Sequence, residues 1–202
     1  MRILSGASLP RPTLFCALIL SLTIWAAPVR GRAPNLPVLD FRSRDFVDGS
    51  LVPLSGEWAI YWGRLLKPGE ITGEVPPAAD GTFNMPSTWN DWVHEGAPVG
   101  GQGCATFAVR LLLPPELETG ALRIPNASTA YKLWGNGVLL AGSGIPGTDR
   151  ASTTPRYRMR SARFNATEGE LLLTLQVANF HHRRGGMWRP IELGTVEAIE
   201  SK

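Results

Sequence analysis

The stretch Leu171-Leu172-Leu173-Thr174-Leu175-Gln176-Val177-Ala178 is the longest apolar run of the chain after its N-terminal segment. Every second position holds a large aliphatic residue, so a strand would place these four side chains on one face: Leu171, Leu173, Leu175 and Val177. A period of two in a mostly apolar run is typical of a well-buried β-strand. The sequence therefore predicts a central strand over 171–178.

A loop rich in cationic and aromatic groups, residues 179–190, follows this strand directly. Guanidinium groups donate in bidentate fashion to anions, imidazoles donate or accept, and an indole can stack on a flat ligand. Loops at the ends of rigid strands often carry binding sites, and the Gly185-Gly186 pair permits close approach of the backbone. We expect these residues to form or border a ligand site: Asn179, His181, His182, Arg183, Arg184 and Trp188.

A structural role is the alternative for the same loop. Arg183 and Arg184 would then pair with Glu57 or Glu192 and fix the strand ends, while Trp188 would fill part of the core. An unpaired buried guanidinium costs several kcal/mol. The arginines must therefore be exposed, paired inside the protein or bound to a ligand.

The composition indicates short strands and turns rather than long helices. The 202 residues include 22 glycines and 17 prolines, and 18% of them are charged. The formal charge of +3 is small and its positive residues are spread along the chain, without the basic face of a nucleic-acid-binding protein. We expect no nucleic-acid partner.

Further alternating segments predict more strands. In 54–62 the side chains of Trp58, Ile60 and Trp62 share one face, which indicates a tryptophan-rich core. Asn136-Gly137 supplies the two positive φ angles of a type I′ hairpin turn. Other short strands are expected at 38–41, 83–85, 105–111, 122–124, 131–134, 138–140 and 157–164, while 191–193 and 196–199 close the domain.

About nine short strands, with no amphipathic helix of three turns, predict an all-β fold. The expected architecture is an antiparallel β-sandwich in the form of a jelly roll.

The N-terminal segment has the pattern of an export signal. Arg2 and Arg11 precede an apolar run over 14–27, and Ala26-Ala27 offers a cleavage point. We expect a signal peptide at 1–27, a flexible leader at 28–37 and a jelly-roll ligand-binding domain at 38–200, in a periplasmic or extracellular protein. The alternative is an uncleaved membrane anchor. After cleavage Cys104 would be the only cysteine left, which excludes an internal disulfide.

Three motifs, in this order, carry a resemblance to a known family: Leu54-Ser55-Gly56-Glu57-Trp58, Met85-Pro86-Ser87-Thr88-Trp89-Asn90 and Leu133-Trp134-Gly135-Asn136-Gly137. They resemble the sugar-binding jelly-roll domain of family 2 glycoside hydrolases, a galactose-binding-like fold. With the run from Ala178 to Gly186, continuing through Arg189-Pro190-Ile191, the chain is more similar still to the extracellular jelly-roll sensor domain of bacterial seven-transmembrane receptors with diverse intracellular signalling modules. This resemblance covers roughly 38–200.

The resemblance implies a sensory module in signal transduction, with a carbohydrate or a carboxylate-bearing small molecule as ligand. It also implies a membrane-bound signalling protein as a partner. Those receptors continue into a membrane domain and an output module, which these 202 residues do not contain. We therefore expect either a free-standing periplasmic relative or a receptor fragment.

Catalytic and metal sites have no signature in the sequence. The carboxylates are scattered, no Gly-x-Ser-x-Gly elbow is present, and the catalytic pair of family 2 hydrolases lies in a separate barrel domain. No His-x-x-x-His or Cys-x-x-Cys accompanies the histidines. We expect no enzyme activity, no metal and no cofactor. The alternative function is a protein-docking or structural module without a small-molecule ligand, which would show a flat apolar patch instead of a pocket.

Overall fold

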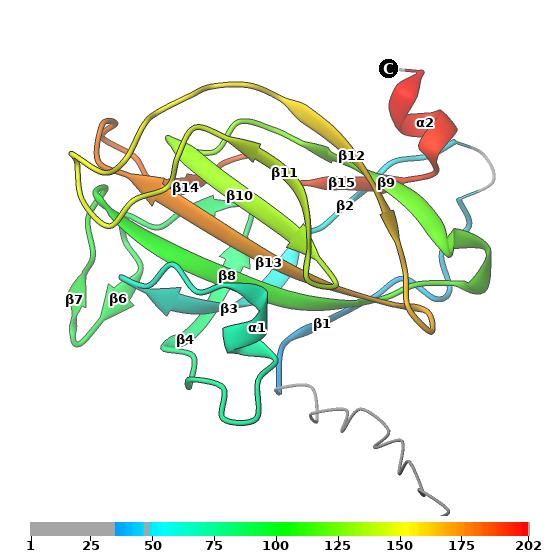
Figure 1. The fold of residues 1–202 in the computed structure, drawn as a ribbon, viewed down its shortest axis with the longest axis horizontal. Coiled ribbons are helices and arrows are strands. Elements are labelled where there is room, and N and C mark those ends of the chain that lie inside the picture. Colours follow the sequence, from blue (N-terminus) through cyan, green and yellow to red (C-terminus); the bar gives the residue numbers. More distant parts are fainter. Residues whose placement is uncertain (1–34, 47–48, 202) are drawn as a thin grey trace, which may run out of the picture. The chain divides into compact units, whose positions relative to one another are not determined.

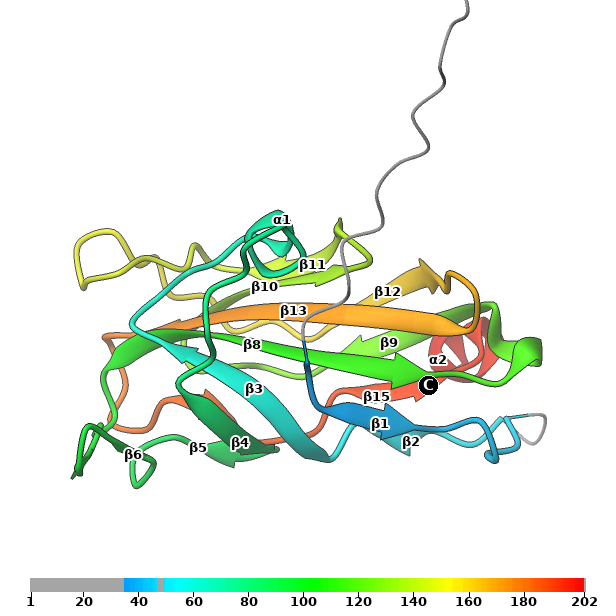
Figure 2. The same ribbon diagram turned by 90° about the horizontal axis from the view of Figure 1, so that it is seen from below.

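The computed structural model describes residues 35–46 and 49–201. The expected signal peptide at 1–27 and most of the expected leader lie outside the described residues. The described chain forms two facing β-sheets with a shared core (Figures 1 and 2). The predicted all-β sandwich is confirmed. Within the described ranges no helix has the length and apolar character needed to cross a membrane.

The larger sheet contains seven strands. Along its path these are β11 (Val138–Ser143), β10 (Ala130–Gly135), β13 (Glu170–Asn179), β8 (Gly103–Leu112), β3 (Gly56–Trp62) and β4 (Gly81–Met85), and β1 (Val38–Asp40) also pairs with β8. All these pairings are antiparallel except that of β1 with β8. Figure 2 shows β13 and β8, the two longest strands, side by side through the molecule.

The second sheet is smaller and faces the first. Its order is β12 (Arg160–Asn165), β9 (Thr119–Ile124), β15 (Glu192–Gly194) and β2 (Val52–Pro53). Two short ribbons pair β14 (Gly186–Met187) with β5 (Ser87–Thr88) and β6 (Val93–His94) with β7 (Ala97–Pro98). The described helices are α1 (Pro68–Ile71), α2 (Val196–Glu200) and a 3-10 turn at Pro115–Leu117.

The strand predicted over 171–178 is confirmed as β13, extended by one residue at each end. The aliphatic side chains that alternate along it lie in the core between the sheets. Its opposite face is also covered, because the loop after β3 lies on it: Gln176 donates through Nε2 to the carbonyl of Leu66, at 3.0 Å. Both faces are therefore buried, which explains why so few charged residues occur in this strand.

Strand β3 also has two buried faces. Trp58 and Ile60 point into the core between the sheets, as predicted, whereas Tyr61 packs in a second apolar cluster with Leu36 and Ile71. Ile71 is the buried residue of the short helix α1. Leu36, which falls within the expected leader, is buried in this second cluster.

The hairpin turn has the predicted geometry, with φ of 46° at Asn136 and 82° at Gly137. Asn136 also binds the neighbouring strand, because its Oδ1 accepts from the backbone N–H of Leu172 at 2.8 Å. The turn therefore fixes the hairpin of β10 and β11 against β13.

One predicted strand boundary is wrong, and one closing segment is a helix. The strand expected over 157–164 begins only at Arg160, whose partner is Ile124, the last residue of β9. The next residue, Pro125, has no N–H to continue the ladder, so Tyr157 and Met159 remain exposed. The segment 196–199, expected among the closing elements, is helix α2, whose N-cap Thr195 accepts through Oγ1 from the N–H of Ala198.

Candidate functional site

Asn179 anchors the loop 179–190 from inside the protein. Its side chain is fully buried, and its Nδ2 donates to the carbonyls of Gly101 at 2.7 Å and His182 at 2.8 Å. Its Oδ1 accepts from the backbone N–H groups of His182 at 3.0 Å and His181 at 3.4 Å. Both amide hydrogens are therefore used within the protein, and Asn179 holds the loop in place.

A second asparagine, Asn90, holds the middle of the loop. Its Nδ2 donates to the carbonyl of Arg183 at 2.9 Å, and its Oδ1 accepts from the N–H of Gly185 at 3.2 Å. Gly185 packs directly on the indole of the buried Trp89, where a Cβ would approach to 2.2 Å. The Gly-Gly pair therefore serves close packing inside the protein.

His182 and Trp188 pack together on the outer side of this anchored loop. Their ring centroids lie 5.1 Å apart with an interplanar angle of 44°. The Nδ1 of His182 lies 3.2 Å from the backbone nitrogen and 3.1 Å from the carbonyl oxygen of Arg184, so it can accept from the former or donate to the latter. The imidazole therefore supports Trp188, whose side chain is 44% exposed.

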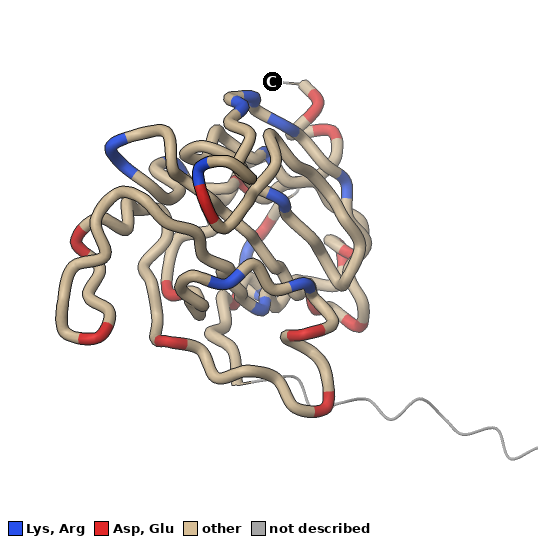
Figure 3. The backbone as a smooth tube through the Cα atoms, turned by 60° about the vertical axis from the view of Figure 1, so that its left-hand side comes forward, with Lys and Arg blue, Asp and Glu red and all other residues tan. Residues whose placement is uncertain are grey.

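His181, Arg183 and Arg184 are exposed. Glu192 forms its ion pair with Arg123 instead, at 2.6 Å, and no ion pair joins Glu57 to a loop arginine among the described residues. The hypothesis that Arg183 and Arg184 pair internally with these carboxylates is therefore wrong. Figure 3 shows positive and negative residues interspersed along the backbone on the side that it presents.

A groove lies beside Trp188, between segments that are distant in the sequence. It consists of two adjoining hollows of about 390 and 330 Å³, which share Pro125, Met159 and Arg189. The remaining lining residues are Asn126, Ala127, Ser128, Tyr157 and Trp188 in the first hollow and Arg123, Pro190 and Glu192 in the second. Hollows of this size fall within the range of small-molecule sites.

The groove combines exposed apolar and aromatic side chains with polar ones. Trp188 is 44% exposed, Tyr157 55% and Met159 58%, which is unusual for side chains of this size. Arg123 and Glu192 pair with each other in the second hollow. Arg189 lines both hollows, and no ion pair or hydrogen bond of its guanidinium occurs in the described part of the chain.

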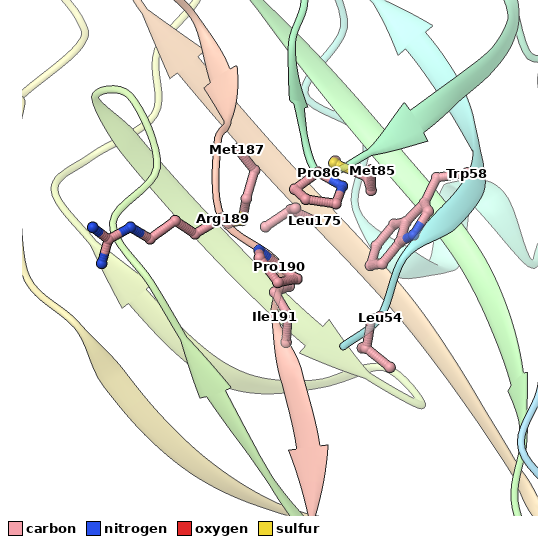
Figure 4. A pocket seen from close by; sticks show the side chains of 9 residues that line it. All are labelled: Leu54, Trp58, Met85, Pro86, Leu175, Met187, Arg189, Pro190 and Ile191. Atoms are coloured by element: carbon pink, nitrogen blue, oxygen red, sulfur yellow. The ribbon is translucent and has the colours of Figure 1, made fainter. Parts of the chain in front are cut away.

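A separate apolar pocket of about 10 Å³ lies in the core next to the groove. Figure 4 shows Trp58, Met85, Met187 and Leu175 around it, whereas the guanidinium of Arg189 extends away from them. This pocket is too small and too apolar for a ligand, but it shows that the backbone on either side of Arg189 is packed into the core.

Of the six residues expected from the sequence, Trp188 lines the groove. Asn179 and His182 support the loop behind it, and the other three are exposed elsewhere on the loop. Sequence reasoning did not single out Arg189 or Tyr157, although an arginine in the cationic loop and an aromatic residue in a basic stretch were available signals.

Two buried titratable groups, Cys104 and Tyr131, lie outside the groove. Burial raises the pKa of the Cys104 thiol to about 11 and that of Tyr131 to about 12. Over residues 35–46 and 49–201, no three His, Cys, Asp or Glu side chains gather in a way that would hold a metal ion.

Neither a protein-family model nor a curated protein sequence matches the chain. Solved structures do: a β-glucuronidase from an uncultured Clostridium is 18% identical with a TM-score of 0.52, over 71% of this chain and 28% of that enzyme. The β-glucuronidase of Bifidobacterium dentium, complexed with coumarin-3-O-glucuronide, is 17% identical with a TM-score of 0.51, over 71% and 29%. The β-glucuronidase of Dictyoglomus thermophilum is 14% identical with a TM-score of 0.51, over 71% of this chain and 27% of that enzyme.

These similarities show the fold. The chain spans less than a third of the length of each enzyme. The predicted likeness to the galactose-binding-like jelly-roll domain of family 2 glycoside hydrolases is therefore confirmed as a likeness of fold. The narrower likeness to the sensor domain of seven-transmembrane receptors stays a prediction.

Proposed function

We propose that this chain is a non-catalytic ligand-binding module that takes a sugar or a carboxylate-bearing small molecule in the groove. The observation that carries this proposal is the position of Trp188, an exposed indole held by His182, beside the unpaired guanidinium of Arg189. Exposed aromatic rings stack on the apolar faces of sugar rings, and a guanidinium donates to hydroxyls or to a carboxylate.

The absence of catalysis is part of the proposal. Glycoside hydrolysis uses two carboxylates on either side of the scissile bond. Among the described residues that line the groove, Glu192 is the only carboxylate, and it is ion-paired with Arg123. The groove therefore suits binding rather than hydrolysis.

Export and a sensory role complete the proposal. They are supported by the Arg-flanked apolar run at 14–27 and by the resemblance of the loop 179–190 to that of bacterial receptor sensor domains. Cell fractionation tests export: a mature species that begins near Ala27 or Pro28 outside the cytoplasm is expected. A full-length product confined to the cytoplasm would contradict it.

Ligand binding is tested by a thermal-shift screen of neutral sugars, sugar acids and short carboxylates. We expect at least one class to raise the melting temperature of the parent, and Trp188→Ala to abolish the shift. Leu139→Ala is the matched control, because Leu139 is also exposed but lies on β11 and does not line the groove. If no compound shifts the parent, or if both variants lose the shift equally, the groove is not the ligand site.

A further inference from the structure

The charges that line the groove do not cancel. Two guanidiniums, those of Arg123 and Arg189, face one carboxylate, that of Glu192. The Arg123–Glu192 pair, at 2.6 Å between Nε and Oε2, is itself only partly exposed, so this carboxylate is already engaged. Among the described residues that line the groove, one positive charge, that of Arg189, is therefore not balanced by a carboxylate.

The backbone of Arg189 is held in place by its neighbours in the chain. Trp188 on one side rests on His182, and on the other side Pro190 and Ile191 pack around the small core pocket. Figure 4 shows the guanidinium extending away from that pocket. Because the backbone of Arg189 is already anchored, ligand binding has to order only its side chain.

Two aromatic residues line the same hollow as Arg189. Trp188 and Tyr157 line the hollow that Arg189 enters, together with the amide of Asn126. Flat apolar surface next to a bidentate donor suits a ligand that has both a ring face and a planar anion. A short carboxylate would leave most of a hollow of about 390 Å³ empty. A neutral sugar could accept hydrogen bonds from Arg189 only through its hydroxyls, which are weaker than the bidentate, charge-assisted bonds of a carboxylate.

We propose that the groove recognises a sugar acid, with the pyranose ring on Trp188 and Tyr157 and the carboxylate on the guanidinium of Arg189. This inference rests on the proposed ligand-binding function and narrows its ligand class. Arg189 is then the residue that discriminates acidic from neutral sugars. Glu192, by pairing with Arg123, leaves Arg189 as the one unpaired guanidinium among the described residues that line the groove.

The test compares three ligands that differ only at C6: a methyl glucuronide, its methyl ester and the methyl glucoside, together with the same set in the galacto series. Dissociation constants are measured by ligand-observed NMR on the parent chain. We expect the free acid of at least one series to bind about tenfold or more tightly than its ester and its neutral sugar, because a charge-assisted hydrogen bond to a carboxylate is worth at least that factor.

Variants then assign the preference to a residue. Arg189→Gln should remove the preference for the acid and leave the affinity for the neutral sugar unchanged, while Arg189→Lys, which keeps the charge but loses the bidentate fork, should retain part of it. Glu192→Gln releases Arg123 and should strengthen binding of the acid. Arg184→Gln is the matched control, since Arg184 is exposed and does not line the groove; it should change nothing.

The possible outcomes separate this inference from the function on which it rests. If acid, ester and neutral sugar bind equally and all lose affinity in Trp188→Ala, the proposed function stands and the preference for acids is refuted. If the acid preference survives Arg189→Gln, the role of Arg189 is refuted. If no ligand of either series binds, both the inference and a sugar-binding function of this groove fail.

Discussion

Replacement of Asn179 by alanine would test the conclusion that this residue positions the loop. The side chain is fully buried and makes three short hydrogen bonds: to the carbonyls of Gly101 and His182, at 2.7 and 2.8 Å, and from the N–H of His182, at 3.0 Å. Each contributes about 1 kcal/mol, and a backbone group left buried without a partner costs about 1–3 kcal/mol. Asn179→Ala should therefore lower the free energy of unfolding by about 3 kcal/mol.

Denaturant unfolding followed by tryptophan fluorescence measures this change, and hydrogen exchange locates it. Exchange of the His182 N–H should accelerate more than that of core amides in β13, because the loop is released first. Asn179→Asp is an informative companion, since it keeps the shape but replaces both donated hydrogens with an oxygen that faces two carbonyls. It should be at least as destabilising. A loss below about 1 kcal/mol in both variants would refute the anchoring role of Asn179.

Other predictions concern the core, the loop arginines and a buried thiol. Trp58→Ala should cost about 3–5 kcal/mol in thermal or chemical unfolding, whereas Trp58→Phe should cost much less, because the indole N–H has no hydrogen-bond partner among the described residues; equal losses would contradict this. Arg183→Ala and Arg184→Ala should each leave the free energy of unfolding within about 0.5 kcal/mol, since both side chains are exposed; a large loss would indicate an internal partner. Burial raises the pKa of Cys104 from 9.0 to about 11, so the folded state keeps a proton that the unfolded chain releases. Its contribution to stability is therefore complete below pH 9 and is lost as the pH rises to about 11, and Cys104→Ala should flatten this part of the pH–stability curve. A curve unchanged by the substitution would show that the thiol titrates normally.

The fold was largely predictable because its signals are local. Alternation in β13 and β3 depends only on the two-residue period of a strand, and the positive φ angles at Asn136 and Gly137 follow from the dipeptide itself. The errors arose where a local pattern depends on a partner strand. Tyr157 and Met159 alternate like strand residues, but pairing stops beside Pro125.

The site was less predictable, because its parts come from separate segments. The sequence shows directly that a cationic, aromatic loop follows a predicted buried strand, which indicates Trp188 and a ligand site near it. The folded structure was needed to show that Asn179 turns inward, that Arg184 faces solvent, and that Arg189 and Tyr157 line the same groove. In irregular backbone, side-chain direction is not set by a period but by long-range hydrogen bonds such as those of Asn90 to the loop, and no local pattern encodes those contacts.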